Sequence, residues 1–227
     1  MKEPNQASKP PYYPAFLDVC GLRCVVVGGG RVATRKVRAL VDAGAAVRVV
    51  SPRVCPELEA LAAEAGVELR ATAFGPAEVE GAVLAFAATD DAAVNEAVAR
   101  EALARGVLVN VVDQPELSTF IVPAVLSRGK LQVAISTGGA SPAFARRLRE
   151  RLEGILSPRL AAYMDTMAEV RALVIEQVAG QRERARIFEA LASDDSFKSY
   201  LEAGQENADA MLMEKTRELI ARAGAAQ

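Results

Sequence analysis

The chain has 227 residues, of which 51% are hydrophobic and 25% charged, and its 27 basic side chains nearly balance 29 acidic ones. This composition is typical of a globular protein with buried cores and gives no reason to expect nucleic-acid binding. Histidine is absent, which excludes the catalytic triads and metal sites that depend on imidazole.

The cysteines and the N-terminus favour a cytoplasmic protein. Cys20, Cys24 and Cys55 form no C-x-x-C pair, and an odd number argues against a disulfide framework. No apolar run is long enough to cross a bilayer. Residues 1–11 are polar, with three prolines, and lack the apolar stretch of a signal peptide. We therefore expect no membrane contact, and a disordered lead-in at the N-terminus.

The first half of the chain alternates short apolar runs with helical patterns. The β-branched run 23–27 predicts a buried strand, and the helical pattern after it ends at Gly44. Further strands are expected at 47–50, 67–71, 83–87 and 108–112, and further helices at 57–65 and 91–104. We expect Ala93, Ala97 and Leu103 to face inward from the last helix. This order predicts right-handed crossovers and an α/β fold with a parallel sheet of the Rossmann type.

The pattern changes beyond residue 116. Apolar runs at 120–126 and 131–136 flank the turn sequence Ser127-Arg128-Gly129-Lys130, which is typical of a hairpin. Only helical patterns follow, at 143–156, 160–179, 183–192 and 208–223. The sequence therefore predicts three parts, which are a Rossmann domain at 12–115, a hairpin-containing segment at 116–156 and an all-helical C-terminal domain at 157–227.

The strongest motif is Gly28-x-Gly30-x-x-Ala33, which directly follows the first strand and opens a helix. The first glycine permits a tight turn, the second lets the backbone approach a pyrophosphate, and alanine keeps the helix close to the strand. The helix N-terminus then stabilises the phosphates. A tight turn that holds no ligand is the alternative, but the surrounding strands and helices favour dinucleotide binding.

The residues after the second and fourth strands leave the choice of nucleotide open. The acidic residue that usually ends the second strand and binds the ribose 2′-hydroxyl is missing. Ser51 is a candidate for the ribose, and Arg53 for a 2′-phosphate unless it is only a solvated charge. Thr89 and Asp90 end the fourth strand on the same edge and are further cofactor-binding candidates. Asp90 or Asp91 is expected to cap the next helix.

Asp113 comes just past the fifth strand, on the edge where open α/β sheets bind ligands. Because the chain has no histidine, a carboxylate at this place is the natural candidate for proton transfer. The alternative is a cap of the turn before Pro115. Asn110, in the same run of residues, is a candidate for substrate binding.

The segment 136–142 combines hydroxyls, glycines and the start of a helix. Ser141 followed by Pro142 is typical of an N-cap and a first helical residue. The backbone N–H groups and hydroxyls of this loop form a candidate cradle for anions, and the arginines beyond it can bind carboxylates. A well-capped surface helix with a solvated basic face is the alternative. The candidates for substrate binding are Ser136, Thr137, Ser141 and Arg146.

Six motifs follow one another in a specific order. They are YPAFL (13–17), VVGGGRVATRK (26–36), AATD (87–90), NVVD (110–113), STFIVPA (118–124) and STGGASP (136–142). Together they resemble the precorrin-2 dehydrogenase family, which includes the dehydrogenase–ferrochelatase module of siroheme synthase. The resemblance covers about residues 12–156. No methyltransferase domain follows, so we expect the stand-alone form.

The resemblance implies oxidation of precorrin-2 to sirohydrochlorin with NAD as the cofactor, and we expect no resident metal. In some members it also implies insertion of Fe²⁺ to give siroheme, so a bifunctional enzyme is the alternative. It assigns catalysis to Asp113 and places Arg31, Val32, Pro52 and Arg53 along the dinucleotide. The middle segment of the family dimerises, so we expect a homodimer.

The expected substrate fits the basic and hydroxyl-rich segment near residue 140. Precorrin-2 carries carboxylates around its ring, which gives the hydroxyls and arginines of 136–146 a use. A hypothesis from another class is a non-catalytic module that senses a dinucleotide. Such a module would need the glycine turn but neither Asp113 nor the loop at Thr137, so the presence of both favours an enzyme.

Overall fold

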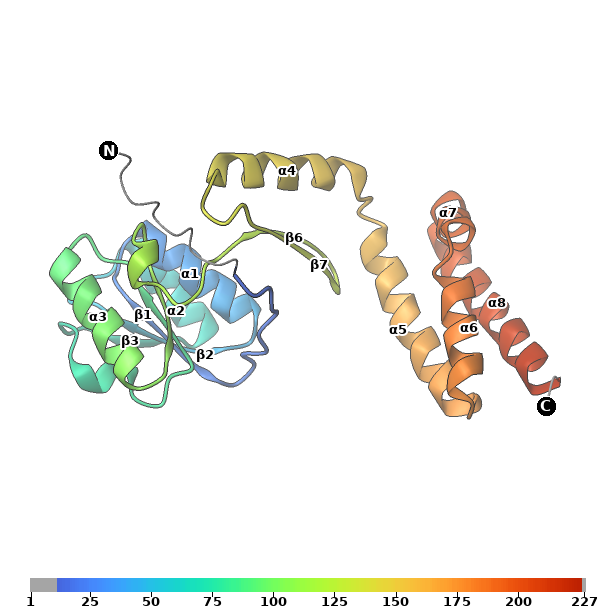
Figure 1. Cartoon of the computed structure of the whole chain (residues 1–227), viewed down its shortest axis with the longest axis horizontal. Coiled ribbons are helices and arrows are strands. Elements are labelled where there is room, and N and C mark those ends of the chain that lie inside the picture. Colours follow the sequence, from blue (N-terminus) through green and yellow to red (C-terminus); the bar gives the residue numbers. More distant parts are fainter. Residues whose placement is uncertain (1–11, 226–227) are drawn as a thin grey trace, which may run out of the picture. The chain divides into compact units, whose positions relative to one another are not determined.

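The computed structural model describes residues 12–225, so the N-terminal stretch where a disordered lead-in is expected lies outside the described residues. The chain divides into two compact units, the first ending at Val122 and the second beginning at Pro123 (Figure 1). None of the helices in this part of the chain is long and apolar enough to cross a membrane. The finer division predicted at residues 115 and 156 stays a prediction.

The first unit is built on a five-stranded parallel sheet in the order β3-β2-β1-β4-β5. The strands are β1 (Arg23–Val27), β2 (Ala46–Val50), β3 (Glu68–Arg70), β4 (Leu84–Ala87) and β5 (Leu108–Val111). The helices between them are α1 (Arg31–Asp42), α2 (Pro56–Ala65) and α3 (Ala92–Ala104). Each lies where the sequence pattern predicts it, and the Rossmann-type sheet is confirmed. Because β1 lies between β2 and β4, their carboxyl ends flank the crevice where such sheets bind ligands.

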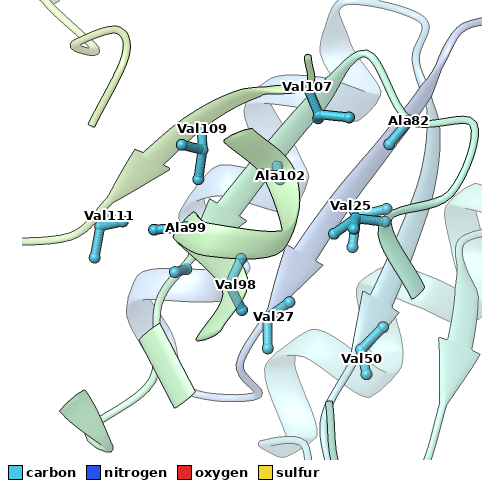
Figure 2. Close-up of a cluster of buried hydrophobic side chains, with 13 residues drawn as sticks. Val25, Val27, Val50, Ala82, Val98, Ala99, Ala102, Val107, Val109 and Val111 are labelled. Carbon is cyan, nitrogen blue, oxygen red and sulfur yellow. The ribbon is translucent and has the colours of Figure 1, made fainter. Parts of the chain in front are cut away.

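The central strands β1 and β4 are buried on both faces, as the β-branched run of β1 predicts. On one face, Val26 of β1 and Phe86 of β4 pack with α1 and α2. On the other face, Val25 and Val27 pack with α3, as Figure 2 shows for the cluster around Val98. Alternate residues of one strand thus serve two separate cores.

The buried face of α3 differs from the expected one. Its buried side chains are Asn95, Val98, Ala99 and Ala102. Ala93 is exposed, Ala97 is half-buried, and Leu103 is 53% exposed. The prediction was wrong because alanine occupies several sides of this helix, so its sequence has little contrast between an apolar and a polar face.

The second unit begins with the expected hairpin of β6 (Ala124–Arg128) and β7 (Leu131–Ile135), which are antiparallel with Arg128 opposite Leu131. Helix α4 (Pro142–Ile155) packs on this hairpin. The expected start of the first strand at residue 120 was wrong. Phe120 belongs to the first unit, where its ring meets that of Phe86 edge to face at 5.4 Å.

The rest of the second unit is helical, as expected. The helices are α5 (Leu160–Gln177), α6 (Gln181–Leu191), α7 (Asp194–Glu202) and α8 (Gln205–Ala225). They share a core in which Leu191, Tyr200 and Leu212 are almost fully buried. Helix α7, which is short and polar, was not predicted, although Ser193 at its start accepts a hydrogen bond from the Ser196 N–H as an N-cap does.

Candidate dinucleotide-binding and catalytic site

A cavity of about 780 Å³ opens at the carboxyl ends of β1, β2 and β4. Its walls are residues 27–32, 50–55 and 88–91, with Ala73, Phe74 and Val94 completing the lining. The structure therefore brings together every residue predicted to bind the cofactor. These are Gly28, Gly30, Arg31, Val32, Ser51, Pro52, Arg53, Thr89 and Asp90.

Two of the three glycines in the turn are required by close packing. Gly28 has a φ of +128°, and a Cβ there would lie 2.3 Å from the Ala88 carbonyl oxygen. A Cβ on Gly29 would lie 1.9 Å from the Arg53 carbonyl oxygen. The turn is therefore pressed against the loops that follow β2 and β4, and only glycine permits this approach.

Gly30 is different, because nothing inside the protein requires a glycine there. Its φ of −91° suits any residue, and a Cβ would meet no atom within 4 Å. The open space lies at the N-cap of α1, which has no side-chain cap and no acidic residue in its first turn. An uncapped helix N-terminus beside an open backbone is suited to an anion. These residues therefore fit the pyrophosphate of a dinucleotide.

The loop after β2 is held by its own polar groups. The Ser51 hydroxyl donates to the Arg53 carbonyl oxygen at 2.6 Å, and the Cys55 N–H donates to the Gly29 carbonyl oxygen at 2.8 Å. The Arg53 side chain is exposed at the cavity. Cys55 also lines the cavity, and its contact with the Thr34 hydroxyl lowers the pKa of the thiol. Sequence reasoning missed both Gly29 and Cys55 as parts of this wall.

The loop after β4 rests on Asn95, which sequence reasoning also missed. This buried side chain donates to the Thr89 carbonyl oxygen at 3.0 Å and accepts from the Thr89 hydroxyl at 2.8 Å. Asp91 caps α3 by accepting from the N–H groups of Ala93 and Val94, as one of the two expected caps. Asp90 is left exposed on the cavity wall. The signal for Asn95 was a lone amide in a helix rich in alanine.

Asp113 has the one positive φ of a non-glycine residue in the described part of the chain, at 60°. It sits in the turn closed by the Gln114 N–H, which donates to the Val111 carbonyl oxygen at 3.2 Å. Its exposed carboxylate makes no hydrogen bond or ion pair with any residue of 12–225, so it does not cap this turn. Left-handed backbone at a non-glycine residue is concentrated at functional sites.

The segment 118–120 fixes this turn against β5. The buried Ser118 hydroxyl accepts from the Val111 N–H at 2.9 Å and donates to the Gln114 carbonyl oxygen at 3.0 Å. Asn110 donates from its amide to the Phe120 carbonyl oxygen at 3.0 Å. Asn110 thus lies on β5 close to the turn, but one of its amide hydrogens is already used within the protein.

The remaining substrate-binding candidates lie in the second unit. The Ser136, Thr137 and Ser141 hydroxyls accept from the N–H groups of Gly138, Ser141 and Phe144, at 3.0, 3.0 and 3.2 Å respectively. The predicted N-cap at Ser141 is confirmed. Arg146 is exposed on α4. Three of the N–H groups around this loop are therefore occupied before any anion arrives.

The Cys24 thiol is buried in the core of the first unit. Burial raises the pKa of the Cys24 thiol to about 11, as expected of a packing residue. Within residues 12–225 no three Cys, Asp or Glu side chains gather in a group that would hold a metal ion.

Comparison with known proteins places this site in context. The family described as "Putative NAD(P)-binding" matches residues 15–124, and "Sirohaem biosynthesis protein central" matches residues 128–155. Siroheme synthase 1 of Aeromonas salmonicida is 41% identical over 210 residues, which are 90% of this chain and 45% of the relative. Siroheme synthase of Methylobacillus flagellatus is 45% identical over 178 residues, 77% of this chain and 37% of the relative. The chain thus spans less than half the length of these relatives.

Fold and site together define the first unit as a Rossmann-type dinucleotide-binding domain. A solved structure described as SirC, precorrin-2 dehydrogenase, matches with a TM-score of 0.75 and 26% identity, covering 91% of this chain and 100% of that one. The chain belongs to the precorrin-2 dehydrogenase and siroheme synthase family. The matched NAD(P)-binding family supports the prediction of NAD as the cofactor.

Proposed function

We propose that this protein oxidises precorrin-2 to sirohydrochlorin with NAD as the hydride acceptor. One observation carries the proposal. The uncapped glycine turn and the strained Asp113 lie on the same carboxyl edge of one sheet, after the neighbouring strands β1, β4 and β5. A cofactor cradle and a free carboxylate at one edge are what a dehydrogenation needs.

The residues of this chain divide the work. When bound, NAD supplies the acceptor for one hydride from the substrate. The N–H groups at the start of α1 and the open backbone at Gly30 hold the pyrophosphate, and Ser51 and Arg53 lie along the cavity where the ribose is bound. Asp113 takes the proton that leaves with the hydride, so the substrate loses two hydrogens in all.

The second unit is proposed to serve the substrate and the assembly. Ser136, Thr137, Ser141 and Arg146 are candidates for its carboxylates through free hydroxyl protons and a guanidinium. A two-stranded sheet is marginal alone, and β6 and β7 pair only with each other among the described strands. Their open edges support a homodimer in which a second copy extends the sheet. We place this dimer in the cytoplasm.

Insertion of Fe²⁺ into the product is a second candidate activity. The observation that favours it is the Asp113 carboxylate, which has no bonding partner in residues 12–225 and can accept a pyrrole N–H proton. Iron would then be a substrate and not a resident metal.

An anaerobic assay with precorrin-2 and NAD⁺, with and without Fe²⁺, tests both activities. We expect NADH to appear in step with sirohydrochlorin, followed by the siroheme spectrum only if iron is inserted. A chain that binds NAD⁺ by calorimetry but forms no NADH would instead be a dinucleotide-sensing module. If NADH forms but adding Fe²⁺ does not change the sirohydrochlorin spectrum, the protein is a dehydrogenase and not a chelatase.

A further inference from the structure

Lys36 of α1 lies over the sheet instead of extending into solvent. Its ammonium is 5.5 Å from the centre of the Phe86 ring, and Phe86 is only 5% exposed. The Phe86 ring in turn meets Phe120 edge to face. The lysine is therefore half-buried on an aromatic surface beside β4, on the same face of the sheet as α1 and α2.

Among the described residues this ammonium has no carboxylate counter-ion. No carboxylate of residues 12–225 lies within ion-pair distance of it, whereas exposed Lys130 pairs with Asp165 at 2.8 Å. Burial lowers the pKa of Lys36 and the neighbouring Arg35 lowers it further, while the charge of Asp113 raises it. The Phe86 ring offsets part of the cost of desolvating this cation, but no carboxylate of the described residues neutralises it. Its position therefore suits an anion supplied by a ligand.

The position of Lys36 indicates that this anion belongs to the substrate and not to the cofactor. Lys36 does not line the 780 Å³ cavity in which the dinucleotide is proposed to bind. The Phe86 ring beneath Lys36 packs against Phe120, and the Phe120 carbonyl oxygen accepts a hydrogen bond from Asn110 on β5, the strand that precedes the turn of Asp113. A group that binds next to Lys36 therefore lies on the side of the sheet near the proposed proton acceptor.

We propose that Lys36 binds a carboxylate of the tetrapyrrole substrate and so anchors the ring beside Asp113, an inference that rests on the proposed function. The aromatic surface of Phe86 and Phe120 holds the lysine stem in place. An ammonium and a carboxylate form a charge-assisted hydrogen bond that fixes one edge of the ring.

The test compares Lys36→Met with wild type in the NADH assay and in an absorbance titration with sirohydrochlorin, the reaction product. We expect the KM for precorrin-2 and the Kd for sirohydrochlorin to rise about 10- to 100-fold, as for a lost hydrogen bond to a charged group. The affinity for NAD⁺ stays within about twofold, and this value also shows that the variant is folded. Lys36→Arg keeps the charge and restores most of the affinity.

Arg35→Met is the matched control, because it removes a cation one residue away on the exposed side of α1. We expect it to leave both constants within about twofold of wild type. An unchanged KM and Kd in Lys36→Met, or a fall in kcat alone, would overturn the assignment of Lys36 and leave the proposed function intact. A wild-type protein that forms no NADH from precorrin-2 would overturn both.

Discussion

The glycine turn before α1 and the glycine-rich loop before α4 share a composition but satisfy their backbone groups differently. Before α1, the N-cap is Gly30 and no side chain caps the helix. Before α4, Ser141 caps the helix and Pro142 removes a further N–H group. The Ser136 and Thr137 hydroxyls accept from two more N–H groups of the same loop.

The difference shows that glycines before a helix do not by themselves make an anion site. What matters is whether the helix start is capped from within. The turn before α1 leaves its N–H groups for a ligand, whereas the loop before α4 is largely complete alone. A substrate carboxylate at the second loop would thus be held by hydroxyl protons and by Arg146 and not by the backbone.

The largest effect is expected from the substitution that tests whether catalysis takes place at the sheet edge that carries the glycine turn before α1. Asp113→Asn keeps the size of the side chain, and asparagine tolerates the left-handed backbone of this turn as aspartate does. It removes the base, so kcat for NADH formation should fall by about 10²–10⁴-fold. The affinity for NAD⁺, measured by calorimetry, should equal that of wild type. Turnover near that of wild type would show that Asp113 takes no part in proton transfer.

The next effect tests the open helix start. Gly30→Asp has room for its side chain, since a Cβ there meets no atom within 4 Å. Its charge would lie beside the pyrophosphate, where like charges cost several kcal/mol, so NAD⁺ should bind about 10²-fold more weakly or worse. Circular dichroism should show an intact fold, and Gly30→Ala serves as the uncharged control. Equal affinities in wild type and Gly30→Asp would remove the dinucleotide from this turn.

A smaller effect is expected where packing, and not the ligand, requires a glycine. In Gly29→Ala the new Cβ would collide with the Arg53 carbonyl oxygen, which belongs to the backbone and cannot rotate away. The loop after β2 must shift, at a cost of about 1–3 kcal/mol in the free energy of unfolding measured with urea. If this variant is as stable as Gly30→Ala, close packing does not require a glycine at residue 29.

The smallest effect is expected in the loop 136–142, whose own side chains cap α4. Ser141→Ala removes the cap of α4, so the free energy of unfolding should fall by about 1 kcal/mol. The affinity for NAD⁺ should stay at the wild-type value, because this residue lies outside the unit that holds the cavity. A weakened affinity for NAD⁺ would mean that the second loop contributes to the cofactor site.

Much of the fold was predictable because its signals are local. Short apolar runs and helical patterns along the sequence predicted the five strands and three α-helices of the first unit. The inward face of α3 was not predictable, since alanine on several sides gives the same spacing for more than one face. Helix α7 was missed because its burial depends on partners in α5 and α8 and not on its own apolar content.

The candidate site likewise has residues that could be predicted from the sequence and residues that could not. Gly28, Gly30 and Asp113 follow from their spacing along strands and turns. Gly29, Asn95 and the setting of Lys36 depend on contacts between segments distant in sequence, so no local pattern reveals them. The hydrogen bonds that occupy the Ser136 and Thr137 hydroxyls likewise appear only once the loop is folded.

The glycine turn is joined to the loops around it by main-chain hydrogen bonds. Gly28 donates to the Val50 carbonyl oxygen at 3.0 Å, and Cys55 donates to that of Gly29 at 2.8 Å. These bonds use main-chain groups and no side-chain atom, whereas the Arg53 side chain is exposed at the cavity. If Arg53 contacts the ribose as proposed, the ability to hold a dinucleotide and the preference for one dinucleotide over another are separable properties. A substitution at residue 53 would then change the preference and leave the main-chain turn intact.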